Sequence, residues 1–139
     1  MFDRQTSTLE QDALAHLIES GFYDRHVRRM RRRNKERRQA LLNALREHFD
    51  GEITIQGTEA GLHLVVWFIN VPSSLENKLV SLACELGVGL YPVSSLYWSQ
   101  KKTLPKGTGL VFGYSALTAD EIKVGISILS NCIEKLNTA

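Results

Sequence analysis

The chain has 139 residues, of which 43% are hydrophobic and 23% charged, and its formal net charge is +2. This length fits a single domain with a real core, and the proportions are typical of a soluble globular protein. The longest apolar run, residues 64–69, is far shorter than the roughly 20 residues of a membrane-spanning helix. The N-terminus has no apolar signal core, so we expect a cytoplasmic protein without a membrane segment.

The first predicted element is a helix that begins just after Ser7. Residues 7–10 read Ser-Thr-Leu-Glu, a capping box in which Ser7 and Glu10 satisfy free backbone N–H groups. Three apolar residues then share one face of the helix: Leu14, Leu17 and Ile18. Gly21 is expected to end or bend this helix.

A second, long helix is predicted from about Tyr23 to Phe49. Within it, residues 25–38 carry eight arginines and one lysine against one acid, so this segment holds +8 and the rest of the chain −6. Asn34 and Arg37 interrupt the apolar stripe, so the middle of the helix should face water or a polar partner. Arginines at this density repel one another unless acids or phosphates lie nearby. The segment is therefore either a nucleic-acid-binding arm or a solvated helix face.

Two strands and a helix follow. Residues 51–56 alternate as a strand does, and residues 62–69 form an apolar interior strand, with a glycine-bounded turn between the two. We expect His63, on the second strand, to be a hydrogen-bonded core residue rather than a ligand. Pro72 and a serine cap open the next helix, which Gly87 ends.

The last part of the chain contains two more strands and a helix. Residues 88–93 predict a short strand, and Pro92 places it at an edge or at its end. Residues 94–109 form a polar loop, and residues 110–115 the last strand. A second capping box, residues 118–121, opens the final helix. The fold class is therefore α+β, a two-layer sandwich with a small, mostly antiparallel sheet of about four strands and helices on one face. A long Arg-rich helix precedes this sandwich in the sequence.

No catalytic or metal-binding constellation is visible in the sequence. None of the four histidines is paired with an acid or a cysteine at a suitable spacing, and no phosphate-binding loop occurs. Cys84 and Cys132 lie far apart in helical patterns, so we expect two reduced, buried thiols. The chain is not expected to be an enzyme by itself.

The loop at residues 94–109 is the best candidate for ligand contact. Three of its residues form the candidate ligand-facing set: Tyr97, Lys101 and Lys102. Tyr91 and Trp98 could complete the wall of a pocket, and Lys106 could also meet an anion. The alternative is an ordinary exposed loop whose lysines serve solubility.

Several stretches together resemble a known family. They read LAHLIESGFYDRHVRRMRRRNKERRQALLNAL, GTEAGLHLVVWF, GVGLYPVSSLYW and GLVFGYSALTADEIKVGISIL. They look like the C-terminal part of MocR-type regulators, GntR-family proteins in which a winged helix-turn-helix precedes a domain similar to a fold-type-I aminotransferase. The resemblance covers about residues 9–136.

The resemblance implies a fragment of a larger parent protein. Residues 1–50 would be a helical connecting segment and residues 51–139 the small α/β subdomain, while the winged helix and the Schiff-base lysine would lie in the missing remainder. The parent would bind pyridoxal phosphate, form a homodimer and contact DNA through its winged helix. No cofactor is expected to bind this fragment, and the Arg-rich run would be mostly a solvated face.

The sequence departs from the family pattern at two positions. Many fold-type-I aminotransferases carry, on the last strand, an arginine that binds the substrate carboxylate through both oxygens. The aligned residue here is Val111, and no arginine follows Arg46. Transamination by the parent becomes doubtful, although Lys101 or Lys102 could take part as a point charge. Asn34 stands where the family suggests a tyrosine.

Two alternatives remain beside the regulator. The parent could be a true fold-type-I aminotransferase without a DNA-binding part. The chain could also be a free-standing nucleic-acid-binding module that uses the helix Arg25–Arg38, in which case its affinity would fall steeply with salt.

Overall fold

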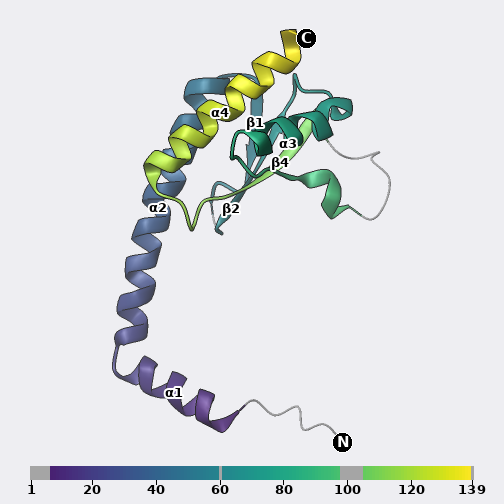
Figure 1. Cartoon of the computed structure of the whole chain (residues 1–139). Coiled ribbons are helices and arrows are strands. Elements are labelled where there is room, and N and C mark those ends of the chain that lie inside the picture. The colour runs from purple at the N-terminus through teal and green to yellow at the C-terminus, as the bar shows by residue number, and fades with distance from the viewer. Residues whose placement is uncertain (1–6, 60, 98–104, 139) are drawn as a thin grey trace, which may run out of the picture. The chain divides into compact units, whose positions relative to one another are not determined.

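The computed structural model describes residues 7–59, 61–97 and 105–138 (Figure 1). The chain divides into two compact units, Met1–Lys35 and Glu36–Ala139. The boundary between them falls within the long helix α2 (Phe22–Phe49).

The first unit consists of helix α1 (Thr8–Glu19) and the beginning of α2. Gly21 separates the two helices with a φ of 72°, a left-handed conformation that glycine adopts without strain, so the predicted break is confirmed. The predicted capping box at the start of α1 is wrong. Ser7 holds the N-cap position, but its side chain makes no capping hydrogen bond.

The second unit contains a four-stranded sheet in the order β1-β2-β4-β3, in which every neighbouring pair is antiparallel. The strands are β1 (Ile53–Gln56), β2 (His63–Phe68), β3 (Tyr91–Pro92) and β4 (Thr108–Gly113). The predicted hairpin of the first two strands and the edge position of Pro92 are both confirmed. The predicted α+β class, with a small antiparallel sheet, is therefore confirmed as well.

Helices pack against one face of this sheet (Figure 1). They are the C-terminal half of α2, α3 (Glu76–Glu85) and α4 (Ala119–Thr138). The most deeply buried side chains of the core come from all these layers: Leu45, Leu64, Val66, Leu79, Leu110 and Leu129. Phe49 of α2 meets Phe68 of β2 edge to face, with ring centroids 5.1 Å apart, an arrangement that aromatic pairs favour.

Three local predictions are corrected by the structure. A 3-10 turn, Ser73–Leu75, precedes α3, and neither it nor α3 has a side-chain cap, so the expected serine cap is absent. Strand β3 has two residues rather than six, and it ends at Pro92, which has no N–H to donate to a sheet. Cys132 is buried as expected, but Cys84 is exposed.

The loop before β4 is shorter than the sequence suggested. A 3-10 turn occupies Val93–Leu96, and β4 already begins at Thr108. The fully buried Thr108 hydroxyl donates to the carbonyl of Val71, at 3.0 Å. This hydrogen bond lets a polar residue stand in the core, so the strand extends two residues further than its apolar run.

Gly107 should be the least replaceable glycine of the second unit. It has a φ of 98°, and a Cβ there would lie 2.1 Å from the Phe68 carbonyl oxygen. Gly107→Ala should therefore cost about 2 kcal/mol or more, because a backbone clash adds to the strain of a left-handed residue. Gly87→Ala is the control, since Gly87 has a φ of 83° but open space at its Cβ, and should cost about 1–2 kcal/mol. Equal losses in denaturant unfolding would contradict the clash.

Candidate functional site

The two faces of the sheet have different environments. Side chains alternate along a strand, so Leu64, Val66 and Leu110 point into the core beneath the helices. On the outer face, the register places His63 opposite Gly113, Val65 opposite Val111 and Trp67 opposite Gly109. Val65 and Val111 are only half-buried. The part of the outer face around these two valines is thus available to a ligand or a neighbouring surface.

A hollow of about 410 Å³ lies on this outer face, between the ends of β2 and β4, strand β3 and the turn that follows it. Its described lining residues are His63, Tyr91, Pro92, Ser95, Leu96, Val111 and Gly113. Val111 is central, because it pairs with Val65 on one side and with Tyr91 on the other. The lining contains no arginine, lysine or carboxylate among the described residues. The hollow therefore suits an uncharged group, with hydrogen-bonding side chains on its wall.

His63 belongs to this hollow and not to the core. The prediction that it is a buried, hydrogen-bonded residue is wrong, because His63 is the first residue of β2 and its side chain is exposed. A Cβ on Gly113 would lie 3.3 Å from the Cδ2 atom of His63. Glycine at position 113 therefore leaves room for the imidazole on the sheet surface.

Trp67 lies further along the same face. It is 4% exposed, and a Cβ on its partner Gly109 would come within 2.8 Å of the indole ring. The ring therefore packs flat against a strand position that only glycine fits. Among the described residues its buried Nε1 has no hydrogen-bond acceptor, which is rare for a buried donor and costs free energy.

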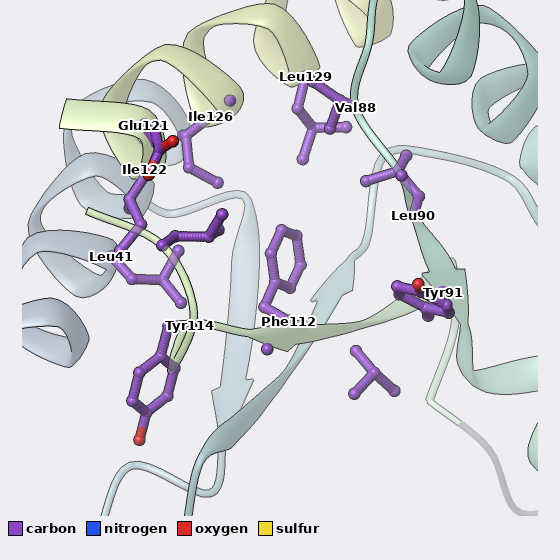
Figure 2. Close-up of a pocket in the computed structure, with 15 residues that line it drawn as sticks. Leu41, Val88, Leu90, Tyr91, Phe112, Tyr114, Glu121, Ile122, Ile126 and Leu129 are labelled. Atoms are coloured by element: carbon purple, nitrogen blue, oxygen red, sulfur yellow. The ribbon is translucent and has the colours of Figure 1, made fainter. Parts of the chain in front are cut away.

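A second, smaller cavity of about 160 Å³ lies on the helix side of the sheet (Figure 2). Phe112 of β4 rises into it, with Leu41 of α2 on one side and Leu90 on the other. Apart from the tyrosines, Glu121 of α4 is the one ionisable side chain among the described residues of its lining. This cavity is a gap between core layers, and its chemistry depends on the state of Glu121.

Glu121 is occupied by helix capping. Its Oε2 accepts from the backbone N–H and the hydroxyl of Thr118, at 2.7 and 2.8 Å, and its own N–H donates to the Thr118 hydroxyl at 3.2 Å. The predicted second capping box is thus confirmed. The pKa of Glu121 is lowered most by the hydrogen bond from the Thr118 backbone N–H, and next by the one from the Thr118 hydroxyl. The charge of Arg37 lowers this pKa least, and burial opposes the lowering. A carboxylate held in its ionised form in this way is poorly suited to act as an acid.

Arg37 explains the gap in the apolar stripe of α2. Its guanidinium is half-buried and donates to the Ser115 carbonyl in the turn between β4 and α4. The middle of the helix thus has the polar partner that its sequence indicates.

The remaining bases of the Arg-rich segment lie mostly in solvent. Six arginines and a lysine are exposed: Arg25, Arg28, Arg29, Arg31, Arg32, Arg33 and Lys35. Val27, Met30 and Asn34 of the same stretch are half-buried, and the helical repeat puts them on one side. Arg25 stacks over the Phe22 ring, 4.4 Å from its centroid. This distribution agrees with a solvated helix face.

The structure places only part of the predicted ligand-facing set. Tyr97 is exposed and directly follows Leu96, which lines the outer hollow. Tyr91 lines the hollow itself. Lys101, Lys102 and Trp98 lie outside the described residues, so a role for Tyr97, Lys101 and Lys102 stays a prediction. The sequence alone does not place His63 and Gly113 together at this hollow, because only the register of β2 with β4 brings them side by side.

Metal and membrane sites can be assessed for the described ranges alone. Within them, no group of three or more histidine, cysteine, aspartate or glutamate side chains could hold a metal ion. The helices of these same ranges are all too short or too polar to cross a bilayer.

Comparison with known proteins identifies regulators along the whole chain. No family model matches the sequence. The chain is 32% identical over 139 residues to the uncharacterized HTH-type transcriptional regulator YhdI of Bacillus subtilis (strain 168), covering all of this chain and 27% of that protein. It is 30% identical over 134 residues to the probable rhizopine catabolism regulatory protein MocR of Rhizobium meliloti, covering 96% and 26%. The chain therefore spans about a quarter of the length of these relatives.

Solved structures of aminotransferases share the fold. The α-aminoadipate aminotransferase LysN of Thermus thermophilus superposes with a TM-score of 0.77 at 24% identity, covering 98% of this chain and 33% of that one. A multiple substrate aminotransferase of Thermococcus profundus gives 0.70 at 21%, covering 86% and 28%. The regulators and the aminotransferases together are consistent with the C-terminal aminotransferase-like region of MocR-type regulators. At these identities, the aminotransferases support the fold and say nothing of activity.

The capping box predicts a pH dependence of stability in this MocR-like chain. A carboxylate whose pKa is lowered by folding stabilises the fold above its ordinary pKa, and this contribution disappears as the pH falls through the folded-state value. Glu121→Gln should therefore lower the melting temperature at pH 7, and its difference from the wild type should vanish in acid. Asp120→Asn is the control, because it removes a charge from the same turn and leaves the Thr118–Glu121 hydrogen bonds in place. A difference that persists at pH 2 would contradict this origin.

Proposed function

We propose that these 139 residues form the small, ligand-facing subdomain of a pyridoxal phosphate-dependent MocR-type transcription regulator. In this proposal residues 1–50 are the connecting segment and residues 51–139 the subdomain. The outer face of the sheet turns toward the cofactor and the effector, which are bound mainly by the rest of the longer protein. The chain itself is not an enzyme.

The observation that carries this proposal is the match to an HTH-type transcriptional regulator and to MocR over 96–100% of the chain. The relatives are 30–32% identical over 134–139 residues, and the matched region includes both the outer hollow and the Arg-rich helix. The open outer face supports the same role, because a subdomain that closes over a ligand needs one face that its own helices do not cover.

The described residues do not form a cofactor site by themselves. Pyridoxal phosphate needs a lysine for its Schiff base and several donors for its phosphate. The lysines within the described ranges are exposed and none lines the outer hollow: Lys35, Lys78, Lys106, Lys123 and Lys135. This chain therefore contributes a cover to a site whose chemistry resides elsewhere, and Tyr97, Lys101 and Lys102 are the proposed ligand-facing part of that cover.

A true aminotransferase is the second candidate, because the solved structures of similar fold are aminotransferases. Such enzymes bind a substrate carboxylate, for which the planar fork of an arginine is well suited. Val111 lies at the centre of the outer hollow instead, and an isopropyl group cannot bind a carboxylate. This residue favours a regulator over a transaminating parent.

The proposed signal is a shift between open and closed arrangements of the parent. A ligand shifts such an equilibrium only by the difference in its affinity for the two states. The outer hollow provides that difference if the ligand touches it only when the subdomain is closed. In the parent homodimer, closure changes how the absent winged helices are presented to DNA.

The proposal predicts how the chain responds to pyridoxal phosphate alone. Mixed with equimolar cofactor, the 139-residue chain should show no stoichiometric imine absorbance band, because a surface lysine without phosphate contacts forms only weak, reversible adducts. A longer regulator that contains the Schiff-base lysine should show the band under identical conditions. A stoichiometric band in the short chain, lost on mutation of a single lysine, would refute the proposal.

A further inference from the structure

The cavity of about 160 Å³ on the helix side of the sheet lies beside the short strand β3. Among the described residues, β3 pairs with β4 over two residues alone. Continued toward α3, the same register would place Leu90 opposite Phe112, and Gly89 opposite Gly113. These four residues line the cavity. The cavity therefore occupies the gap that opens where the segment before β3 and the end of β4 stop pairing.

The end of α3 explains why the two segments separate. Gly87 has a φ of 83°, and the Val88 N–H donates to the Ala83 carbonyl at 2.8 Å. This hydrogen bond is common in helices that end at a left-handed glycine. It holds Val88 at the end of α3, so the chain first pairs with β4 at Tyr91.

The deep wall of the cavity is apolar and leaves room for a ligand. Its large side chains come from α2, α4, β4 and the segment before β3 (Figure 2): Leu41, Leu90, Phe112, Ile122, Ile126 and Leu129. Gly125 lies on the same face of α4, three residues after Ile122, and a Cβ there would have open space around it. An apolar cavity of about 150 Å³ can stay dry and bind a benzene molecule. The volume and the lining thus suit one small ring.

Two polar side chains of the lining are already engaged. The Tyr114 hydroxyl donates to the Gly61 carbonyl at 2.7 Å, and the Glu121 carboxylate accepts from Thr118. The ionised carboxylate would repel an anion, and burying any charge against apolar side chains costs free energy unless the charge is paired. The cavity therefore favours an uncharged ligand.

The backbone of Gly113 offers a polar contact at the edge of the cavity. The Tyr114 N–H donates to the Leu62 carbonyl at 3.4 Å, so the backbone groups of Tyr114 face β2. Neighbouring residues of an antiparallel strand direct these groups to opposite sides, so those of Gly113 face the gap beside Gly89. Both glycines are exposed. The N–H and C=O of one residue together match the acceptor and the donor of an amide.

We propose that this cavity binds a small, uncharged molecule with an apolar body the size of a benzene ring and one amide-like group. The body would lie against Phe112 and the apolar face of α4, and the amide would pair with the backbone of Gly113. Such a ligand would supply, at the edge of β4, the pairing that Gly89 leaves open. This site goes beyond the proposed function and does not depend on it, because all its described residues belong to the second unit of this chain.

Two sets of residues distinguish this site from the outer hollow. Of the described lining residues, Ile122 and Ile126 of α4 belong to the helix-side cavity alone, and His63 and Leu96 belong to the outer hollow alone. Gly113 lines both. Signals from the isoleucines therefore report a ligand in the cavity, and signals from His63 and Leu96 report a ligand in the hollow.

NMR titration of the 139-residue chain with benzamide tests the site. The methyl resonances of Ile122 and Ile126 and the amide resonance of Gly113 should shift together, while the resonances of His63 and Leu96 stay in place. Benzoate and benzylammonium, which have similar shapes and carry opposite charges, should bind roughly tenfold more weakly or worse. Shifts at His63 and Leu96 without shifts at the two isoleucines would overturn the proposal. So would the absence of any shift up to the solubility limit of benzamide, or a charged ligand that binds as tightly.

Three variants on α4 test whether the ligand occupies the space beside Gly125. Gly125→Leu fills that space and should weaken benzamide binding roughly tenfold or more, and Gly125→Ala should weaken it by a smaller factor. Leucine and alanine favour a helix more than glycine does, so both variants should remain folded, which their melting curves check. Val124→Leu is the control, because Val124 is 59% exposed and outside the described lining, and it should leave binding unchanged. Unchanged binding in both Gly125 variants, or an equal loss in Val124→Leu, would refute the assignment of the ligand to this cavity.

Discussion

The structure depends on burying one face of a four-stranded sheet. Leu64 and Val66 of β2 and Leu110 of β4 are almost completely buried against Leu45 of α2 and Leu129 of α4. Because successive side chains of a strand point to opposite faces, this core also determines what faces outward. A slip of one residue would exchange the two sets. The apolar contacts that stabilise the fold therefore also position the outer hollow.

The composition of the outer face limits what it can bind. Val111 lies between Val65 and Tyr91, and the described wall of the hollow offers an imidazole, a phenol and a hydroxyl but no guanidinium. Such a surface gives contact area and a few hydrogen bonds, which are suited to covering a ligand that another part of the protein already holds. The smaller cavity on the helix side differs, because the carboxylate of Glu121 in its lining accepts hydrogen bonds from Thr118.

Much of the fold was predictable because it follows local patterns. The helical spacing of apolar residues in α2, the Thr118–Glu121 capping box and the glycine-bounded hairpin are all patterns among residues that are close in sequence. Not every local pattern held, since Ser7 has the right spacing but makes no capping hydrogen bond. Other errors depend on packing and on distant contacts. Cys84 lies on the exposed side of α3, and Thr108 joins β4 because its hydroxyl donates to the Val71 carbonyl. The loop at residues 94–109 could be identified as a candidate for ligand contact from its composition. The juxtaposition of His63 with Gly113 could not be predicted, because it depends on the register of two strands that lie far apart in the sequence.

Methyl NMR of a regulator that contains these residues tests the central claim, that the outer face meets the ligand. The probe is pyridoxal phosphate together with a panel of amino acids and amines. We expect that the mixture to which the regulator responds shifts the methyl resonances of Val65 and Val111. The methyl resonances of Leu110 and Leu129 should stay unchanged. Shifts confined to Leu110 and Leu129, or a ligand response without any shift at Val65 and Val111, would contradict it.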